Sequence, residues 1–165
     1  NAEEANETEV QKNQKETQKS EKKYLVYTIK SESYGIEIGY VKEIIGMMSI
    51  TAIPKVKKHI RGIINLRGKI IPVIDVRARL ELEETEYDDR TCIVIIEIEG
   101  EKAKKHIGVI VDRVSGVMEI RRDNIVPMQY DEMHIKDKLI SGTAKVDENI
   151  IMIMDMGITT DILHI

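Results

Sequence analysis

The sequence predicts an all-β (mainly β) fold made of two related units, with short helices and a disordered N-terminal tail. Three observations support this prediction: short runs of β-branched and aliphatic residues, a two-residue hairpin turn at Arg67-Gly68, and an internal repeat. Runs such as Cys92 to Ile98 are typical of strands, because β-branched side chains pack well on a pleated surface.

Length and composition limit the classes of protein to which the chain can belong. Its 165 residues fit one ordinary domain or two very small ones that share a core. The net charge of −4 and the absence of Phe and Trp argue against nucleic-acid binding. The single cysteine excludes an intrachain disulfide. No apolar run reaches the roughly 20 residues of a membrane span, and the N-terminus lacks a signal-peptide core, so we expect a cytoplasmic protein without membrane insertion.

Two segments have the composition of connecting or disordered chain. Residues 1–23 are mostly Glu, Lys, Gln, Asn and Thr, and they cannot bury enough surface to offset the entropy of ordering. Residues 81–90 are acidic and show no apolar period beyond Leu82. We therefore predict a disordered tail over 1–23 and a linker over 81–90.

The first predicted unit covers about residues 24–80 and is centred on a hairpin. Two apolar runs within Gly62 to Asp75 flank Arg67-Gly68, where glycine supplies a positive φ without steric cost. Asp75 stands at the N-cap position of a helix that begins at Val76. Alternation or spacing of apolar residues predicts the elements before the hairpin: strands at 24–30 and 35–38, a helical turn at 41–45 and a short strand at 50–53.

The second predicted unit covers about residues 91–154 and has the same kind of elements. We expect strands at 92–98 and 107–111, a helical or irregular turn at 114–118, a polar loop at 127–138, and a hairpin at 140–154 around Asp147-Glu148. A terminal helix over 155–163, capped by Asp155, would end the domain.

The internal repeat relates the two units. Residues 62–75 match 142–155 without a gap, and residues 35–38 match 108–111. The second alignment places Val41 on Val114 and Ile44 on Val117. Each unit has about five strands and little core of its own, so we expect the two to pack against each other.

No constellation of residues predicts catalysis, a cofactor or a metal. Cys92 lies in an aliphatic run, where a thiol is usually buried and inert. Asp75, Asp112 and Asp155 could suggest acid–base chemistry, but capping explains two of them more simply. The four histidines lack the spacing of metal ligands: they are His59, His106, His134 and His164.

Several blocks of the sequence resemble the CheW-like chemotaxis coupling proteins. The most specific is GIINLRGKIIPVIDVR (Gly62 to Arg77), which joins an NLRG motif to a PVID motif. The other matching blocks are YGIEIGYVKEII (34–45), TAIPKV (51–56), TCIVIIEI (91–98) and IGVIVDRVSGVMEI (107–120). The motif positions include Asn65, Leu66, Gly68, Pro72, Asp75, Gly108 and Asp112.

The resemblance implies a fold and a role. It implies two SH3-like, five-stranded β-barrels packed around a shared core, and a non-catalytic adaptor that links transmembrane chemoreceptors to the regulatory domain of the CheA histidine kinase. The receptor tip would pack as a helical hairpin in a groove between the barrels, and each barrel could dock on a barrel of the kinase. We expect a monomer in isolation that joins a large receptor array.

The resemblance also implies which residues line the groove: Val41, Glu43, Arg67, Val114 and Val117. The valines could equally be core residues, and Arg67 could be a solvated turn residue paired weakly with Glu43. A second interpretation of the chain is a CheW-like module cut from a CheV-type coupler or a CheA kinase. A small β-barrel hydrolase or ligand carrier is disfavoured by the missing catalytic set.

Overall fold

The computed structural model describes residues 6, 21–79, 86–129 and 139–156, and strands predominate in these ranges. The all-β prediction is confirmed. The elements after the tail are β1 (Glu21–Ile29), β2 (Glu32–Glu37), η1 (Ile38–Tyr40), β3 (Val41–Gly46), β4 (Ile60–Leu66), β5 (Lys69–Ile74), α2 (Val76–Arg79), β6 (Cys92–Ile98), β7 (Lys105–Val111), β8 (Arg113–Arg121), η2 (Arg122–Asn124), β9 (Ile125–Pro127), β10 (Ile140–Val146) and β11 (Asn149–Met154).

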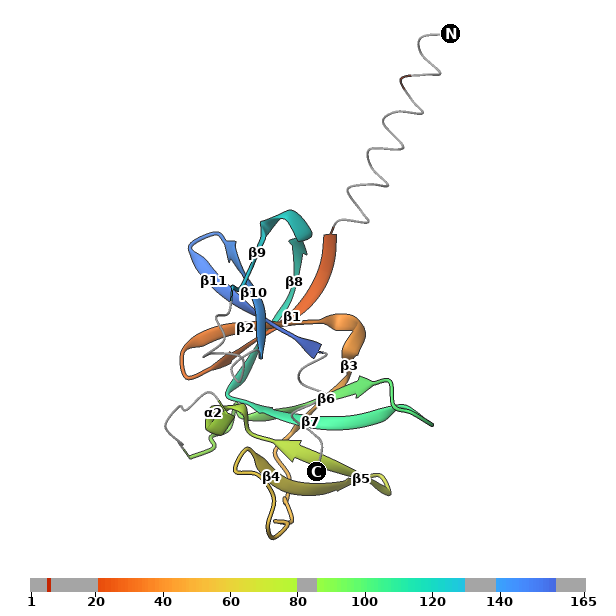
Figure 1. Cartoon of the computed structure of the whole chain (residues 1–165). Coiled ribbons are helices and arrows are strands. Elements are labelled where there is room, and N and C mark those ends of the chain that lie inside the picture. Colours follow the sequence, from red (N-terminus) through yellow and green to blue (C-terminus); the bar gives the residue numbers. More distant parts are fainter. Residues whose placement is uncertain (1–5, 7–20, 80–85, 130–138, 157–165) are drawn as a thin grey trace.

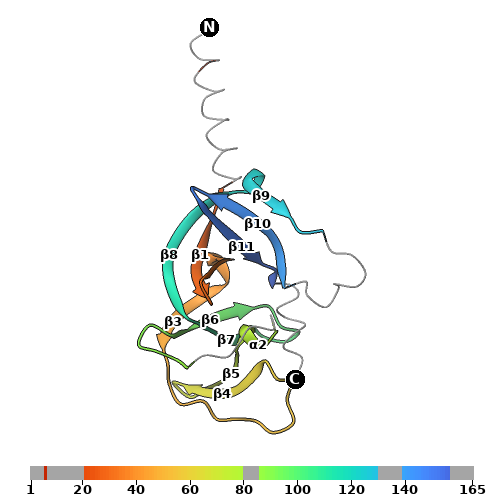
Figure 2. The same cartoon turned by 90° about the vertical axis from the view of Figure 1, so that its left-hand side faces the viewer.

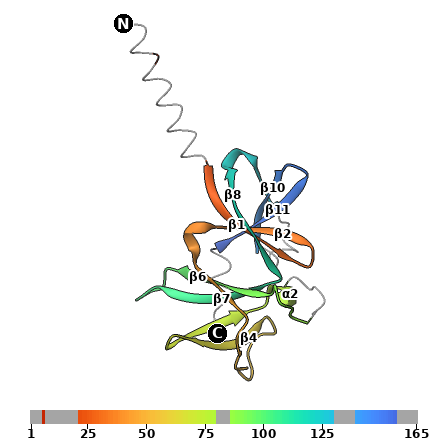
Figure 3. The same cartoon turned by 180° about the vertical axis from the view of Figure 1, so that it is seen from behind.

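The strands form two sheets that lie one above the other (Figure 1). The six-stranded sheet has the order β8-β1-β2-β11-β10-β9, and the five-stranded sheet has the order β3-β6-β7-β5-β4. Most neighbours are antiparallel, but β2 pairs with β11 and β5 pairs with β7 in parallel. The view from behind shows the same separation into an upper and a lower body (Figure 3).

The division into one unit per half of the sequence does not describe these sheets. Strands β1 and β2, from the first half, pair with β8 and β11 of the second half. Strands β6 and β7, from the second half, pair with β3 and β5 of the first half. Each half therefore gives its first hairpin to the sheet of the other half, through crossovers at η1 and at Asp112. A repeat in the sequence shows which strands are equivalent, but it cannot show whether a strand pairs within its own half or with the equivalent strand's neighbours in the other half.

The repeat itself is visible in the backbone. Hairpins β4–β5 and β10–β11 shift register at the same place, before Gly62 and before Gly142. The amide of Asp75 donates to the carbonyl of His59, and that of Asp155 donates to the carbonyl of Leu139, both at 2.8 Å. The predicted turns are also found: Arg67 has φ 50° and Gly68 φ 83°, as a two-residue hairpin loop requires.

Three local predictions are wrong. Residues 41–45 and 114–118 lie in strands β3 and β8 rather than in helical turns. Both are edge strands with a bulge, and a bulge breaks the period of two on which a strand prediction depends. The expected strand at 50–53 is reduced to a single bridge between Thr51 and Ile63.

Two predicted boundaries are corrected, and other expectations lie outside the described residues. Strand β1 begins at Glu21, within the predicted tail, and β9 ends at Pro127, the first residue of the predicted polar loop. Residues 1–5 and 7–20 of the tail, 81–85 of the linker, 130–138 with His134, and 157–163 of the expected terminal helix with His164 beyond it are not described.

Three apolar clusters fill the structure. One lies inside the six-stranded sheet and includes Tyr24, Val26 and Ile151. A second lies inside the five-stranded sheet and includes Ile64 and Ile93. The third and largest is the shared core: it combines residues of both sheets, such as those on alternate positions of β1, β6 and β7. The sheets are therefore held together by apolar burial, as the small size of each unit predicts.

The register shift near the start of β4 offers a test of the fold. Gly62 has φ 146°, and a Cβ there would collide with the carbonyl oxygen of Thr51. We expect Gly62→Ala to lower the free energy of unfolding by about 2 kcal/mol or more, measured by urea denaturation. Gly46→Ala is the matched control, because no atom lies within 4 Å of a Cβ at that position. Equal stability of the two variants would contradict the packing described for this hairpin.

Candidate functional site

The two edge strands β3 and β8 bring sequence-related residues to the boundary between the sheets. Figure 2 shows both strands on one side of the molecule, β8 above and β3 below. Val41 on β3 and Val114 on β8 are half-buried, and both pack against the shared core. The predicted valines thus border one apolar cluster from opposite sheets.

Strand register shows which way these side chains face. Val41 pairs with Ile96, Val114 with Tyr27 and Val117 with Leu25, and all three partners belong to the shared core. Directly paired residues lie on the same face of a sheet. Val117 therefore lies on the face directed toward the shared core, yet 57% of it remains exposed.

Ile44 belongs with these valines and was missed as a groove residue. It pairs with Val94, a member of the shared core, and is 44% exposed. The repeat already aligned Ile44 with Val117, so symmetry was the signal that could have identified it. Together Val41, Ile44, Val114 and Val117 form the seam surface, two residues from each sheet.

Glu43 and Arg67 lie on the other face of β3. Glu43 pairs with Ile95, which faces the interior of the five-stranded sheet, and its carboxylate forms an ion pair with Arg67. A hollow of about 230 Å³ includes both residues and is floored by Ile71 and Ile95. The arginine side chain is 70% exposed, so the pair contributes less than about 1 kcal/mol to stability. The structure therefore brings Glu43 and Arg67 together but sets them apart from the seam surface.

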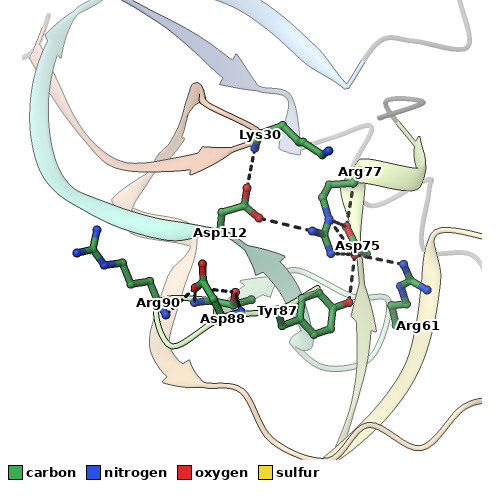
Figure 4. Close-up of polar contacts among 9 residues, drawn as sticks. Lys30, Arg61, Asp75, Arg77, Tyr87, Asp88, Arg90 and Asp112 are labelled. Carbon is green, nitrogen blue, oxygen red and sulfur yellow. Dashed lines mark hydrogen bonds and ion pairs between the residues drawn. The ribbon is translucent and has the colours of Figure 1, made fainter. Parts of the chain in front are cut away.

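A buried ion pair follows the central hairpin (Figure 4). Asp75 is fully buried, and its carboxylate accepts hydrogen bonds from the backbone amide of Arg77 at 3.0 Å and from the guanidinium Nη2 at 2.7 Å. The backbone contact caps helix α2, as predicted. Arg61 and the hydroxyl of Tyr87 also contact Asp75, at 3.5 and 3.2 Å.

This network extends from the five-stranded sheet to the six-stranded one. Arg77 reaches Asp112 at 3.7 Å, and Asp112 accepts a hydrogen bond of 2.7 Å from the backbone amide of Lys30. Lys30, in the turn between β1 and β2, has φ 51°. The amide of Asp112 also donates to the carbonyl of Thr28, at 2.9 Å. Asp75 and Asp112 thus have structural partners that fix how the sheets meet.

Burial alone would raise the pKa of Asp75. The hydrogen bonds from Arg77 and the positive charges of Arg77 and Arg61 outweigh burial, so its pKa lies below the usual value of a carboxyl group. The carboxylate is therefore ionised at neutral pH, and it is a poor candidate for a general acid or base there.

The remaining motif residues also have structural places. The side chain of Asn65 accepts a hydrogen bond from the amide of Gly68 at 3.0 Å, closing the turn. Leu66 packs against the interior of the five-stranded sheet, and Pro72 lies opposite Ile63. A Cβ at Gly108 would lie 2.8 Å from the side chain of Ile93, so β7 approaches its neighbours closely there.

The residues weighed for catalysis or metal binding are dispersed. Cys92 is half-buried, and burial raises the pKa of its thiol. His59 is buried, and the half-buried His106 lies 2.7 Å from the carboxylate of Glu97. Within the described ranges, no three His, Cys, Asp or Glu side chains gather as metal ligands would. The part of the chain described here also includes no helix long and apolar enough to cross a membrane.

Comparison with known proteins agrees with this geometry. The CheW-like domain family matches residues 23–160. The chain belongs to the CheW-like family. It is 32% identical over 143 residues to the chemotaxis protein CheW of Bacillus subtilis, covering 87% of this chain and 89% of that protein. Identity to the chemotaxis protein CheW of Klebsiella aerogenes is 29% over 133 residues, covering 81% and 78%.

A solved CheW structure shares the fold. The scaffolding protein TtCheW from Thermoanaerobacter tengcongensis superposes with a TM-score of 0.72 at 37% identity, covering 82% of this chain and 84% of that one. The two sheets described above are consistent with the two SH3-like barrels that the resemblance implied.

The buried ion pair of Asp75 and Arg77 makes the free energy of unfolding depend on pH. A carboxyl group whose pKa is lowered by folding contributes stability above its unfolded pKa of about 3.9, and this contribution is lost as the pH falls through the folded pKa. Asp75→Asn removes the closer of the two carboxylates that face the buried Arg77, so we expect the free energy of unfolding to fall by about 3–5 kcal/mol near pH 7.

The pH dependence distinguishes this charge from general packing. Below pH 4 we expect the stability of wild type to fall toward that of Asp75→Asn, measured by urea denaturation at each pH. Asp89→Asn is the control, because Asp89 is exposed and lies two positions from Tyr87 of the network. This change should leave the dependence of the free energy of unfolding on pH unaltered. If the free energies of unfolding of Asp75→Asn and wild type differ by the same amount from pH 7 to pH 2, the ionised pair is not the source of the lost stability.

Proposed function

We propose that the protein is a non-catalytic adaptor that couples chemoreceptors to the CheA histidine kinase in the cytoplasm. Family membership supports a role in chemotaxis. The observation on which the proposal depends is the seam surface, where Ile44 and Val117 expose apolar area at repeat-related positions beside the shared core. Exposed apolar surface at such a boundary is typical of a binding site rather than of a reaction site.

The receptor tip would bind this surface as a helical hairpin. A helix presents apolar residues three and four positions apart along one face, which suits a narrow apolar strip between two sheets. Glu43 and Arg67 lie on the opposite face of β3, at its open edge, and would act at the rim, where charges fix register and partner choice more than affinity.

The kinase would dock on the barrels themselves. Ile70 and Ile150 occupy equivalent positions of the two central hairpins and are 60% and 62% exposed. Each barrel thus offers a similar apolar hairpin to a barrel of the kinase regulatory domain. Contacts of this size are individually weak, and a multivalent array would raise their effective strength.

Mutation of the seam surface tests receptor binding. We expect Val117→Asp to abolish detectable pull-down of a receptor-tip fragment, because it places a charge on the apolar strip while leaving the core intact. Val126→Asp is a matched control: Val126 is 65% exposed and lies on β9, at the opposite edge of the same sheet. Arg67→Ala should weaken binding less, as a rim substitution does. A folded Val117→Asp variant that still binds the tip would overturn the proposed groove.

Phosphotransfer separates an adaptor from a kinase fragment. With labelled ATP we expect no incorporation into this chain alone, and increased labelling of CheA when the chain and receptor are both present. Incorporation by the isolated chain would instead identify it as part of a signalling enzyme.

A further inference from the structure

The hollow beside Val114 has a chemistry that the apolar seam does not explain. It has a volume of about 590 Å³ and is lined by Arg90, Cys92, Arg113, Val114 and Ser115. Cys92 is the first residue of β6 in the five-stranded sheet, and Arg90 lies two positions before it. Arg113, Val114 and Ser115 are the first three residues of β8 in the six-stranded sheet. The hollow therefore lies across the boundary between the sheets and includes one residue of the seam surface.

The two arginines in this hollow are available to a partner. Both are exposed, and among the described residues neither guanidinium is in an ion pair. The nearby carboxylate of Asp88 is occupied within its own turn, by the amides of Arg90 and Thr91 and the hydroxyl of Thr91. In Figure 4 the side chain of Arg90 points away from Asp88 and from the buried network.

Docking on Val114 would remove water from these arginines. A cation that is buried without a partner costs several kcal/mol, whereas one that meets a carboxylate in bidentate geometry can be compensated. A ligand on the seam surface must therefore supply negative charge at this end. Two neighbouring exposed cations would also attract an acidic group.

From this we infer that Arg90 and Arg113 form a carboxylate-binding subsite of the receptor-docking surface, occupied by an Asp or Glu of the partner helix. This inference rests on the proposed function and adds the chemistry of the ligand. The acidic residue should lie three or four positions from the apolar residue that contacts Val114, so that both are on one helix face. Ser115 provides a hydroxyl donor beside the same hollow.

Charge reversal tests the subsite. The probe is a helical-hairpin peptide from the tip of a chemoreceptor of the same organism, titrated against the full chain. We expect Arg113→Glu and Arg90→Glu each to raise the Kd about tenfold at low salt and to flatten its dependence on salt concentration. The matched control is Arg121→Glu, on the same strand, because Arg121 is already paired with Asp123 at 3.1 Å.

Compensation identifies the chemical group on the partner. Each Asp and Glu of the peptide is changed to Lys in turn, and one of these changes should restore binding to the Arg113→Glu variant while weakening binding to wild type. Equal affinity of wild type and both arginine variants would overturn the subsite while leaving the proposed function intact. A wild-type chain that does not bind the peptide would overturn both.

A free anion is the other possible occupant. Sulfate and chloride are compared as competitors at equal ionic strength. If sulfate displaces the peptide more strongly and no single Lys substitution in the peptide compensates for Arg113→Glu, the hollow binds inorganic anions and the inference is wrong. If the two salts displace the peptide equally and one Lys substitution in the peptide restores binding to Arg113→Glu, the inference is supported.

Discussion

The structure depends on the exchange of the first hairpin between the two halves of the chain. Strands β1 and β2 complete a sheet whose other strands all come from the second half, and β6 and β7 complete the sheet of the first half. Neither half contains all the strands of either sheet, so neither can complete a sheet alone. The shared core follows directly, because the exchanged hairpins face each other across the boundary between the sheets.

A polar network joins the two sheets, and its central arginine comes from the first half of the chain. Asp75, Arg77 and Asp112 connect α2 to the crossover after β7 and to the turn between β1 and β2. The equivalent of Arg77 in the second half is Gly157, so the sequence of that half cannot reproduce the pair. The two halves therefore differ in charge at this position, although the backbones of the two central hairpins are alike.

Much of the fold could be predicted because β-branched runs and tight turns are local signals. The hairpin turn at Arg67-Gly68, the cap at Asp75 and the correspondence of the two central hairpins are all fixed by nearby residues. Strand β3 was misassigned, since the spacing of Val41, Ile44 and Ile45 fits a helical turn as well as a bulged strand. The exchange of hairpins could not be predicted, because equivalent strands from either copy satisfy the same local pattern.

Local sequence signals also predict only part of the candidate site. The valines of the seam surface were identified through resemblance, while Ile44 needed the strand register to show which way it faces. Arg90 and Arg113 are 23 positions apart in a sequence rich in charge, and only the crossover of the chain between sheets brings them to one hollow. Tertiary placement of this kind leaves no periodic signal in the sequence.

The interleaved hairpins have a consequence for the assembly of the polypeptide during synthesis. Strand β1 pairs with β2 on one edge, and its other edge stays uncovered until β8 is made more than 80 positions later. Until then its bonding edge stays available, and a second nascent copy can supply the missing strands as well as the chain's own end can. Crowded expression should thus favour entwined pairs in which each copy completes its neighbour, a hazard that chains with sequentially closed barrels avoid.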